Sequence, residues 1–224
     1  MTTKVIVFGS HGKIGQRLIK LIAETTAFTA TAVVRNAEQA SEIKKLSKNS
    51  ENITTTELTL TDASVLDLAG AIKGHDAVVL SVGSAGKDLL KVDLDGVVKA
   101  FEASVEANVR RLVLISAVFA NDREFGSASG LHNYYIAKHH ADRILRHEFG
   151  SQLDYTILKP SRLLDGDGTG KIKFLSKYDD PGHVQREDVA KAIFEVLNNK
   201  NTFGKAYDFC EGDLPIDNES TWKQ

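Results

Sequence analysis

The chain alternates between short apolar runs and longer segments in which apolar residues recur every three or four positions. The short runs predict strands at 4–8, 30–34, 53–58, 76–82, 111–116 and 153–158. The longer segments predict helices at 12–24, 37–48, 62–72, 91–107 and 131–148. Strands that are apolar throughout, such as 112–115, indicate burial on both faces and hence a parallel sheet. The pattern predicts an α/β fold, a doubly wound parallel sheet with helices on both faces.

The first strand runs directly into three glycines, Gly9, Gly12 and Gly15, and a helix opens at the second of them. We expect Gly9 to allow a tight turn, Gly12 to let a phosphate approach the backbone, and Gly15 to let the helix pack against its strand. A strand, a glycine turn and a helix in this order present backbone N–H groups to a pyrophosphate. The turn therefore predicts dinucleotide binding and a Rossmann-like domain.

The character of the chain changes after Pro160. A turn-rich stretch at 165–170 precedes a short strand at 171–175, a helix at 186–198 and a strand at 205–210. We expect one domain over residues 1–224, in which 1–159 form the dinucleotide-binding core and 160–224 a small extension on the substrate side. The stretch at 165–170 resembles part of a calcium loop, but Ser176 stands where the bidentate Glu is needed, so we expect a turn and no metal.

Composition adds limits on partners and location. The formal net charge is −2, which gives no electrostatic reason to expect nucleic acid or an anionic membrane as partner. Cys210 is the only cysteine, so no internal disulfide can form and a reducing, cytoplasmic compartment is expected. No stretch approaches the roughly 20 apolar residues of a membrane span, and a strand occupies the place of a signal peptide. We expect a cytoplasmic monomer or homodimer that binds a small-molecule substrate.

The residue after the second strand selects between the two nicotinamide dinucleotides. That residue is Arg35, and a guanidinium can pair with a 2′-phosphate where a carboxylate would repel it. NADP(H) is therefore the expected cofactor, with NAD(H) as the alternative. The expected cofactor-binding residues come from the glycine turn and the loops after the following strands: Gly9, Ser10, His11, Gly12, Lys13, Ile14, Gly15, Arg35, Asn36, Leu60, Thr61, Gly83, Lys138 and Pro160.

Candidate chemistry lies after the fifth strand. Tyr134 and Lys138 are four apart on a predicted helix, so both can face one pocket. The ammonium is expected to lower the pKa of the tyrosine and make its hydroxyl a usable acid or base. Ser116 closes the fifth strand, where its hydroxyl could bind a substrate oxygen. Four histidines at 132–147 lack the spacing of a metal site, and we expect them on a solvated helix face.

Together these motifs resemble the short-chain dehydrogenase/reductase superfamily, in particular its atypical NAD(P)H-binding, epimerase/dehydratase-like branch. The resemblance covers nearly the whole chain. It implies that Tyr134 exchanges a proton with the substrate oxygen during hydride transfer, that Lys138 binds the nicotinamide ribose and that Ser116 orients the substrate. Asp93 stands where the superfamily's tetrad has an Asn, and an acceptor-only carboxylate cannot copy the donor role of an amide.

The leading hypothesis is an NADP(H)-dependent oxidoreductase that acts on a carbonyl or hydroxyl of a small molecule, with Tyr134 as acid/base. A flavin or quinone reductase is a variant that needs no tyrosine. The first alternative is a redox-sensing regulatory protein that binds the dinucleotide without turnover, because related folds have taken that role. The second is an epimerase or dehydratase that uses the dinucleotide without net redox change.

Overall fold

The computed structural model describes residues 2–48 and 50–223. Six strands and the helices between them build its first part. The strands are β1 (Thr3–Phe8), β2 (Phe28–Val34), β3 (Ile53–Glu57), β4 (Ala77–Leu80), β5 (Arg111–Ile115) and β6 (Asp154–Pro160). The helices are α1 (Lys13–Ala23), α2 (Ala37–Leu46), α3 (Val65–Ile72), the π-helix η1 (Leu89–Gly96), α4 (Val97–Glu106), α5 (Arg123–Ala128) and α6 (His132–Glu148).

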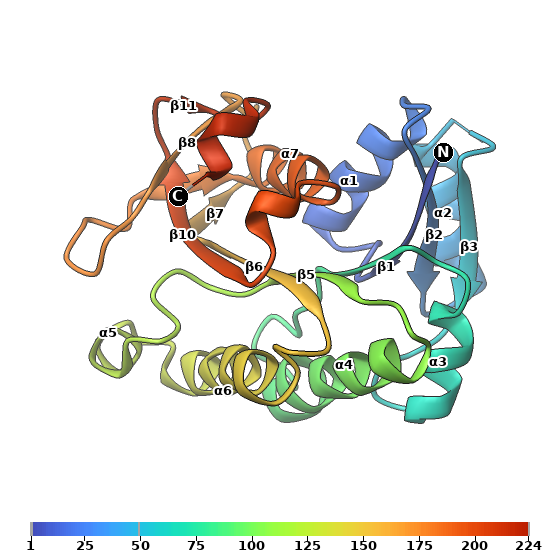
Figure 1. The fold of residues 1–224 in the computed structure, drawn as a ribbon, viewed down its shortest axis with the longest axis horizontal. Coiled ribbons are helices and arrows are strands. Elements are labelled where there is room, and N and C mark those ends of the chain that lie inside the picture. Colours follow the sequence, from blue (N-terminus) through green and yellow to red (C-terminus); the bar gives the residue numbers. More distant parts are fainter. Residues whose placement is uncertain (1, 49, 224) are drawn as a thin grey trace.

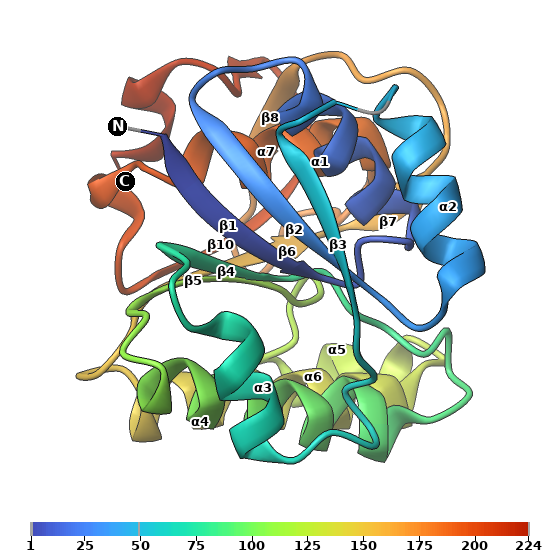
Figure 2. The ribbon, with the colours of Figure 1, turned by 90° about the vertical axis from the view of Figure 1, so that its right-hand side faces the viewer.

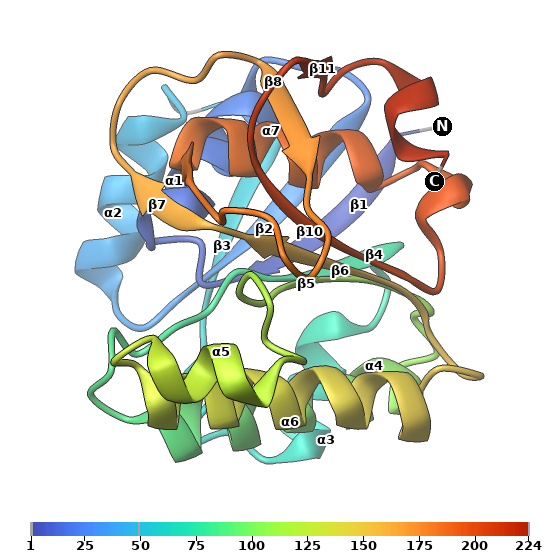
Figure 3. The same ribbon diagram turned by 90° about the vertical axis from the view of Figure 1, so that its left-hand side faces the viewer.

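The remaining chain adds shorter elements around one further helix, α7 (Arg186–Val196). The strands are β7 (Arg162–Leu164), β8 (Lys171–Phe174), β9 (His183–Gln185), β10 (Lys205–Glu211) and β11 (Leu214–Pro215). Two 3-10 turns, η2 (Lys200–Thr202) and η3 (Glu219–Trp222), flank the last strands. In Figure 3 these elements lie in the upper part of the view, above α5 and α6.

The main sheet has the order β11-β8-β10-β6-β5-β4-β1-β2-β3. Every pairing from β3 to β10 is parallel, and only the edge pairings of β8 with β10 and with β11 are antiparallel. The order 3-2-1-4-5-6 within it is that of a doubly wound sheet, which confirms the predicted fold class. The strand order reverses between β1 and β4, so ligands are expected at the carboxyl ends of these strands.

Helices cover both faces of the sheet, as Figures 1 and 2 show: α1, α2 and α7 on one side and α3, α4, α5 and α6 on the other. The alternation of side chains along each strand divides the core accordingly. Val5 and Val7 pack against α1 and α7, whereas Ile6 and Phe8 pack against α3 and α4. Within the described residues no helix is both long and apolar enough to span a membrane.

Four predictions about elements were wrong. The segment predicted as one helix at 91–107 begins earlier, as the π-helix η1, and only continues as an α-helix from Val97. The helix predicted from residue 62 starts at Val65, because Ser64 and Asp67 form a capping box there. Residues 120–130, where no helix or strand is predicted, contain α5, whose amino end Asp122 caps. The extension also contains two strands that were not predicted, β7 before the turn-rich stretch and β9 before α7, and these two strands pair with each other.

Candidate active site at the carboxyl edge of the sheet

The glycine turn has the geometry that a pyrophosphate site requires. Gly9 has φ +78°, and a Cβ at this position would collide with the Ser81 carbonyl. A Cβ on Gly15 would collide with the carbonyl of Gly9, so only glycine allows this packing of helix on turn. Gly12 precedes α1 and gives it no side-chain cap, which leaves the first N–H groups of the helix for an anion. The residues present therefore fit a dinucleotide.

Other residues of the glycine turn have structural partners. The Ser10 hydroxyl is buried and donates to the Val33 carbonyl at 2.6 Å, which ties the turn to β2. His11 contacts Glu42 on α2, and Lys13 reaches Asp165 beyond β7 at 2.5 Å. Ile14 is buried below the turn. The backbone N–H groups of the glycine turn are therefore better placed to bind a phosphate than the side chains of the turn.

The end of β2 presents Arg35 to solvent. Its side chain is exposed and makes no ion pair within the described part of the chain, while its backbone N–H donates to Gln39. Asn36 accepts a hydrogen bond from the Gln39 N–H at 3.0 Å and so caps α2. The guanidinium is thus available to a ligand, whereas the Asn36 side chain is engaged in the helix cap.

Asp93 and Lys138 form a buried ion pair next to the loop after β4. Lys138 Nζ lies 3.6 Å from Asp93 Oδ1, and the two side chains are 5% and 1% exposed. Lys138 Nζ also lies 3.4 Å from the Val82 carbonyl and 3.5 Å from the Ile115 carbonyl. Asp93 Oδ2 accepts from the Ser84 N–H at 3.0 Å, and Oδ1 has no hydrogen-bond partner among the described residues. Burial lowers the pKa of Lys138, against the opposing effect of Asp93.

Tyr134 lies one helical turn before Lys138, as predicted, but its acidity differs from the prediction. Lys138 Nζ is 5.7 Å from the centre of the Tyr134 ring, which packs edge-on against Tyr135. Burial raises the pKa of Tyr134, and the negative charge of Asp93 raises it further. The prediction that the ammonium lowers this pKa is wrong for the protein without cofactor, because burial disfavours the phenolate and the Asp93 carboxylate disfavours it further. The Tyr134 hydroxyl is therefore protonated at neutral pH in this state.

A second set of buried polar side chains lies between α6 and the sheet. Ser116 is 4% exposed and Asp142 is 3% exposed, and neither side chain has a hydrogen bond of normal geometry to the described residues. Lys159, at the end of β6, is 1% exposed and donates to Asn121 at 2.5 Å and to Asp208 at 3.3 Å. Sequence reasoning missed Asp142 and Lys159. Asp142 could have been found, because it follows Tyr134 and Lys138 at the same spacing of four.

The remaining predicted residues lie around this centre. Gly83 approaches Asp93, since a Cβ there would lie 3.5 Å from Asp93 Oδ1. Leu60 packs toward Gly96, and the Thr61 carbonyl accepts from Lys99 at 3.3 Å. Pro160 ends β6 and accepts a hydrogen bond from the Val118 N–H. The glycine turn, Lys138, Ser116 and Asp93 all lie at the carboxyl edge of adjacent strands.

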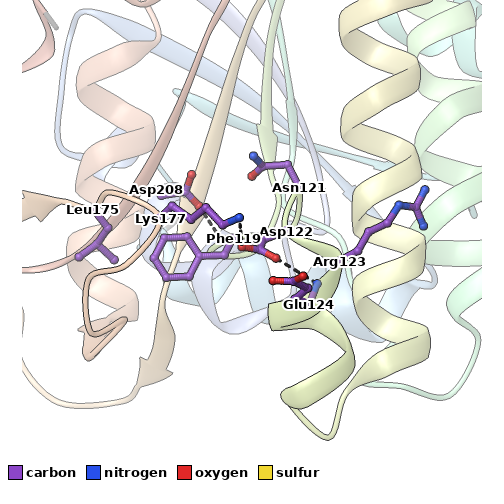
Figure 4. A pocket seen from close by; sticks show the side chains of 8 residues that line it. All are labelled: Phe119, Asn121, Asp122, Arg123, Glu124, Leu175, Lys177 and Asp208. Atoms are coloured by element: carbon purple, nitrogen blue, oxygen red, sulfur yellow. Dashed lines mark hydrogen bonds and ion pairs between the residues drawn. The ribbon is translucent and has the colours of Figure 1, made fainter.

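A pocket of about 410 Å³ opens beyond Lys159. Figure 4 shows its side chains, with Lys177 reaching toward Asp122 at 3.6 Å. The lining residues are Phe119, Asn121, Asp122, Arg123, Glu124, Leu175, Lys177 and Asp208. Phe119 has φ +53°, a strained value for this residue, and its N–H donates to Asp208 Oδ1 at 2.6 Å. The pocket therefore joins the loop after β5 to the extension.

The segments with metal-like patterns have other partners. Gly168, Thr169 and Gly170 donate backbone hydrogen bonds to acidic side chains in the first turn of α7. His139 lies half-buried with Nδ1 3.1 Å from the Ala120 carbonyl, so the histidines do not all lie on a solvated face. No group of three or more metal-ligating side chains occurs in residues 2–48 and 50–223.

Fold and site together define a dinucleotide-binding protein of the doubly wound class. The family model described as NAD(P)H-binding matches residues 9–200, and the chain belongs to this family, within the atypical short-chain dehydrogenase/reductase branch. It is 38% identical over 217 residues to "Uncharacterized sugar epimerase YhfK" of Bacillus subtilis (strain 168), which covers 95% of this chain and 96% of the relative.

Solved structures agree with this assignment. The oxidoreductase ylbE from Lactococcus lactis has a TM-score of 0.85 and 32% identity, covering 96% of this chain and 93% of that chain. A wide-type short-chain dehydrogenase/reductase from Veillonella parvula, solved in complex with NADP, has a TM-score of 0.76 and 20% identity, covering 97% and 98%. The second similarity shows the fold alone.

Proposed function

We propose that this protein is an NADP(H)-dependent oxidoreductase that reduces a carbonyl, or oxidises a hydroxyl, of a small molecule. The observation that carries the proposal is the group formed by half-buried Tyr134 and buried Lys138 and Ser116 at the carboxyl edge of the sheet. It accompanies a turn whose packing at Gly9 and Gly15 leaves no space for a Cβ atom. The dinucleotide, when bound, would exchange a hydride with the substrate. The chain's own residues would bind, orient and supply the proton.

Tyr134 would donate that proton to the substrate oxygen, since its raised pKa keeps it protonated. Ser116 has a buried hydroxyl with no partner of normal geometry among the described residues, so it can donate a hydrogen bond to the same oxygen. Lys138, held by Asp93 and two carbonyls, would bind the ribose hydroxyls. Asp93 Oδ1, which pairs with Lys138 at 3.6 Å but makes no hydrogen bond within the described residues, is a further acceptor for a ribose hydroxyl.

We propose further that the extension 160–224 is part of the same domain and closes the substrate side. Three of its residues, Leu175, Lys177 and Asp208, line the 410 Å³ pocket together with the loop after β5. Both signs of charge and one aromatic ring surround this space, which favours a polar substrate with an unsaturated or ring portion.

The test is turnover of NADPH with a panel of aldehydes, ketones and quinones. The Tyr134→Phe variant should lose about 100-fold or more in kcat with carbonyl substrates, because general acid catalysis contributes at least this factor. Tyr135→Phe is the matched control, since this neighbour has a similar ring environment and its pKa is also raised, to about 12. Unchanged carbonyl turnover in Tyr134→Phe would contradict the assigned mechanism.

A regulatory protein that binds the dinucleotide without turnover is the second candidate. The observation in its favour is the Asp93–Lys138 ion pair, in which the ammonium is already occupied, together with the pKa of Tyr134, which burial raises and the Asp93 carboxylate raises further. Such a protein would bind NADPH and NADP⁺ with normal affinity and oxidise no NADPH with any member of the panel. Turnover that depends on Tyr134 would exclude it.

A further inference from the structure

Asp142 belongs to the same face of α6 as Tyr134 and Lys138, because the three residues follow one another at intervals of four. Its carboxylate is buried, and neither oxygen makes a hydrogen bond of normal geometry with the described residues. A buried carboxylate without hydrogen bonds destabilises the folded protein, so its presence at this position needs an explanation. No role for it follows from the proton donor, the ribose lysine or the substrate-orienting serine.

Charged and polar groups face Asp142 from each element that packs around it. Ser116 comes from the end of β5 and Lys159 from the end of β6. Both belong to the face of the sheet on which Leu114 and Ile157 pack against α6. Lys138 and Arg146 lie one turn before and after it on α6 itself. Asp93 on η1 pairs with Lys138 from the other side, and Asp208 on β10 pairs with Lys159.

Burial and the neighbouring polar groups shift the pKa of Asp142 in opposite directions. Burial raises the pKa of Asp142 to about 6, while the charge of Lys159 and the Ser116 hydroxyl act in the opposite direction and keep it from rising further. The carboxyl is therefore ionised at neutral pH and becomes neutral in mild acid. When it is neutral, Lys138 keeps only Asp93 as a close counter-charge.

We propose that Asp142 is a positioning residue of the nicotinamide site, which sets the net charge around Lys138 according to pH. The inference rests on the proposed function, because it places the nicotinamide at Lys138. The oxidised nicotinamide carries a positive charge and the reduced one does not. An ionised Asp142 consequently favours NADP⁺, and a protonated Asp142 favours NADPH. By linkage, the oxidised cofactor lowers the pKa of Asp142 in return.

The test measures dissociation constants of NADPH and NADP⁺ between pH 5 and 8 by fluorescence and calorimetric titration. In the unmodified protein the ratio Kd(NADP⁺)/Kd(NADPH) should rise about three- to tenfold as the pH falls through about 6, the size expected for one charge acting across a partly buried site. In Asp142→Asn the ratio should stay at the acid value throughout. A ¹³C titration of the aspartate carboxyl groups, compared between the two proteins, should assign the midpoint near 6 to Asp142.

Glu195→Gln is the matched control. This acid on α7 also has a pKa raised by burial, but it lies at a pocket with Asn198 and Asp217, away from α6. The control should keep the full pH dependence of the ratio. A flat ratio in the unmodified protein, or the same inflection in Asp142→Asn, would overturn the inference while leaving NADPH turnover as evidence for the proposed function. An inflection without any turnover would instead support the inference and contradict the oxidoreductase.

Discussion

Single residues differ in how much of their state can be predicted from sequence. The spacing of Tyr134 and Lys138 places both on one face of a helix, and the structure has them so. Their charge states follow from groups that are distant in sequence: Asp93 lies 45 positions before Lys138 and pairs with it in a buried space. The sequence alone gives no measure of that burial, which is why the direction of the Tyr134 shift was predicted wrongly.

The buried Asp142 carboxyl reduces the stability of the fold at neutral pH. Its folded-state pKa of about 6 exceeds the ordinary value of 3.8. The folded protein therefore binds the proton more tightly than the unfolded chain, and stability falls as pH rises between these values. We expect Asp142→Asn to gain about 1 to 3 kcal/mol in free energy of unfolding at pH 7.5 and little at about pH 4. Urea unfolding at both pH values measures this; an equal gain at both would contradict it.

Arg35 tests the cofactor preference without touching the catalytic residues. Its exposed guanidinium has no ion-pair partner in the described residues, so its replacement leaves the fold intact. Arg35→Glu should weaken NADPH binding about 30-fold or more and change NADH binding little, because a carboxylate repels the 2′-phosphate. Titration with the two cofactors measures the ratio. Arg162→Glu, an exposed arginine on β7, is the control and should leave the ratio unchanged.

Elements were predicted well where the hydrophobic pattern is strong and poorly where capping or irregular geometry decides. The pattern predicts a helix between β4 and β5, but it cannot distinguish the wider π-helical turns of η1 from an α-helix. This difference matters, because Asp93 belongs to η1 and reaches Lys138 from it. Likewise α5 is short and polar, so its only signal is the Asp122 cap, which accepts from the N–H groups of Glu124 and Phe125.

Arg111 joins three elements at the opposite edge of the sheet. Its guanidinium donates to the carbonyls of Val196 and Leu197 at 2.6 and 2.9 Å, which caps the end of α7, and to the Asp154 carbonyl on β6 at 2.7 Å. Burial lowers its pKa to about 9, so it remains charged at neutral pH. Arg111→Lys should lose about 2 to 4 kcal/mol of stability, because one ammonium cannot replace the fork of donors.

Thermal and urea unfolding of Arg111→Lys measure that loss. Arg110→Lys is a suitable control, since Arg110 lies next in the chain, is half-exposed, and pairs with Asp154 at 3.3 Å. A surface pair of this kind contributes about 0 to 1 kcal/mol. Similar losses in the two variants would contradict the role assigned to Arg111 in joining α7 to the sheet.

The whole molecule is held together by contacts between segments that the sequence pattern treats as separate. The 38% and 32% identities to relatives over nearly the full chain and the matching topology establish the core, and the NAD(P)H-binding family model over residues 9–200 establishes the class of ligand. The contacts between the extension and helix α1 were not predictable, because they join side chains more than 100 positions apart. Asp165 is the main example: it pairs with Lys13 at 2.5 Å and Arg17 at 3.7 Å on α1, and also with the nearer Arg186 at 2.8 Å.

Asp165 therefore balances a group of cations at the amino ends of α1 and α7. Its pKa is lowered mainly by the hydrogen bond from Lys13, so it is ionised at neutral pH. The dinucleotide carries several negative charges, and Lys13 belongs to the turn proposed to hold its pyrophosphate. Asp165→Ala leaves these cations without their carboxylate. We expect NADPH to bind about two- to tenfold more tightly at low ionic strength, with the difference shrinking at about 0.5 M salt, where exposed charges are screened.

Fluorescence titration with NADPH at the two salt concentrations measures this effect. Asp217→Ala is the matched control, because Asp217 forms an exposed ion pair with Lys191 on the same helix, α7, at a distance of 2.9 Å, and its pKa is also lowered by a lysine. That variant should leave NADPH affinity unchanged at either salt concentration. Weaker binding in Asp165→Ala would mean that the carboxylate holds Lys13 and the glycine turn in the binding geometry. The cations would then act through the position of the turn and not through their free charge.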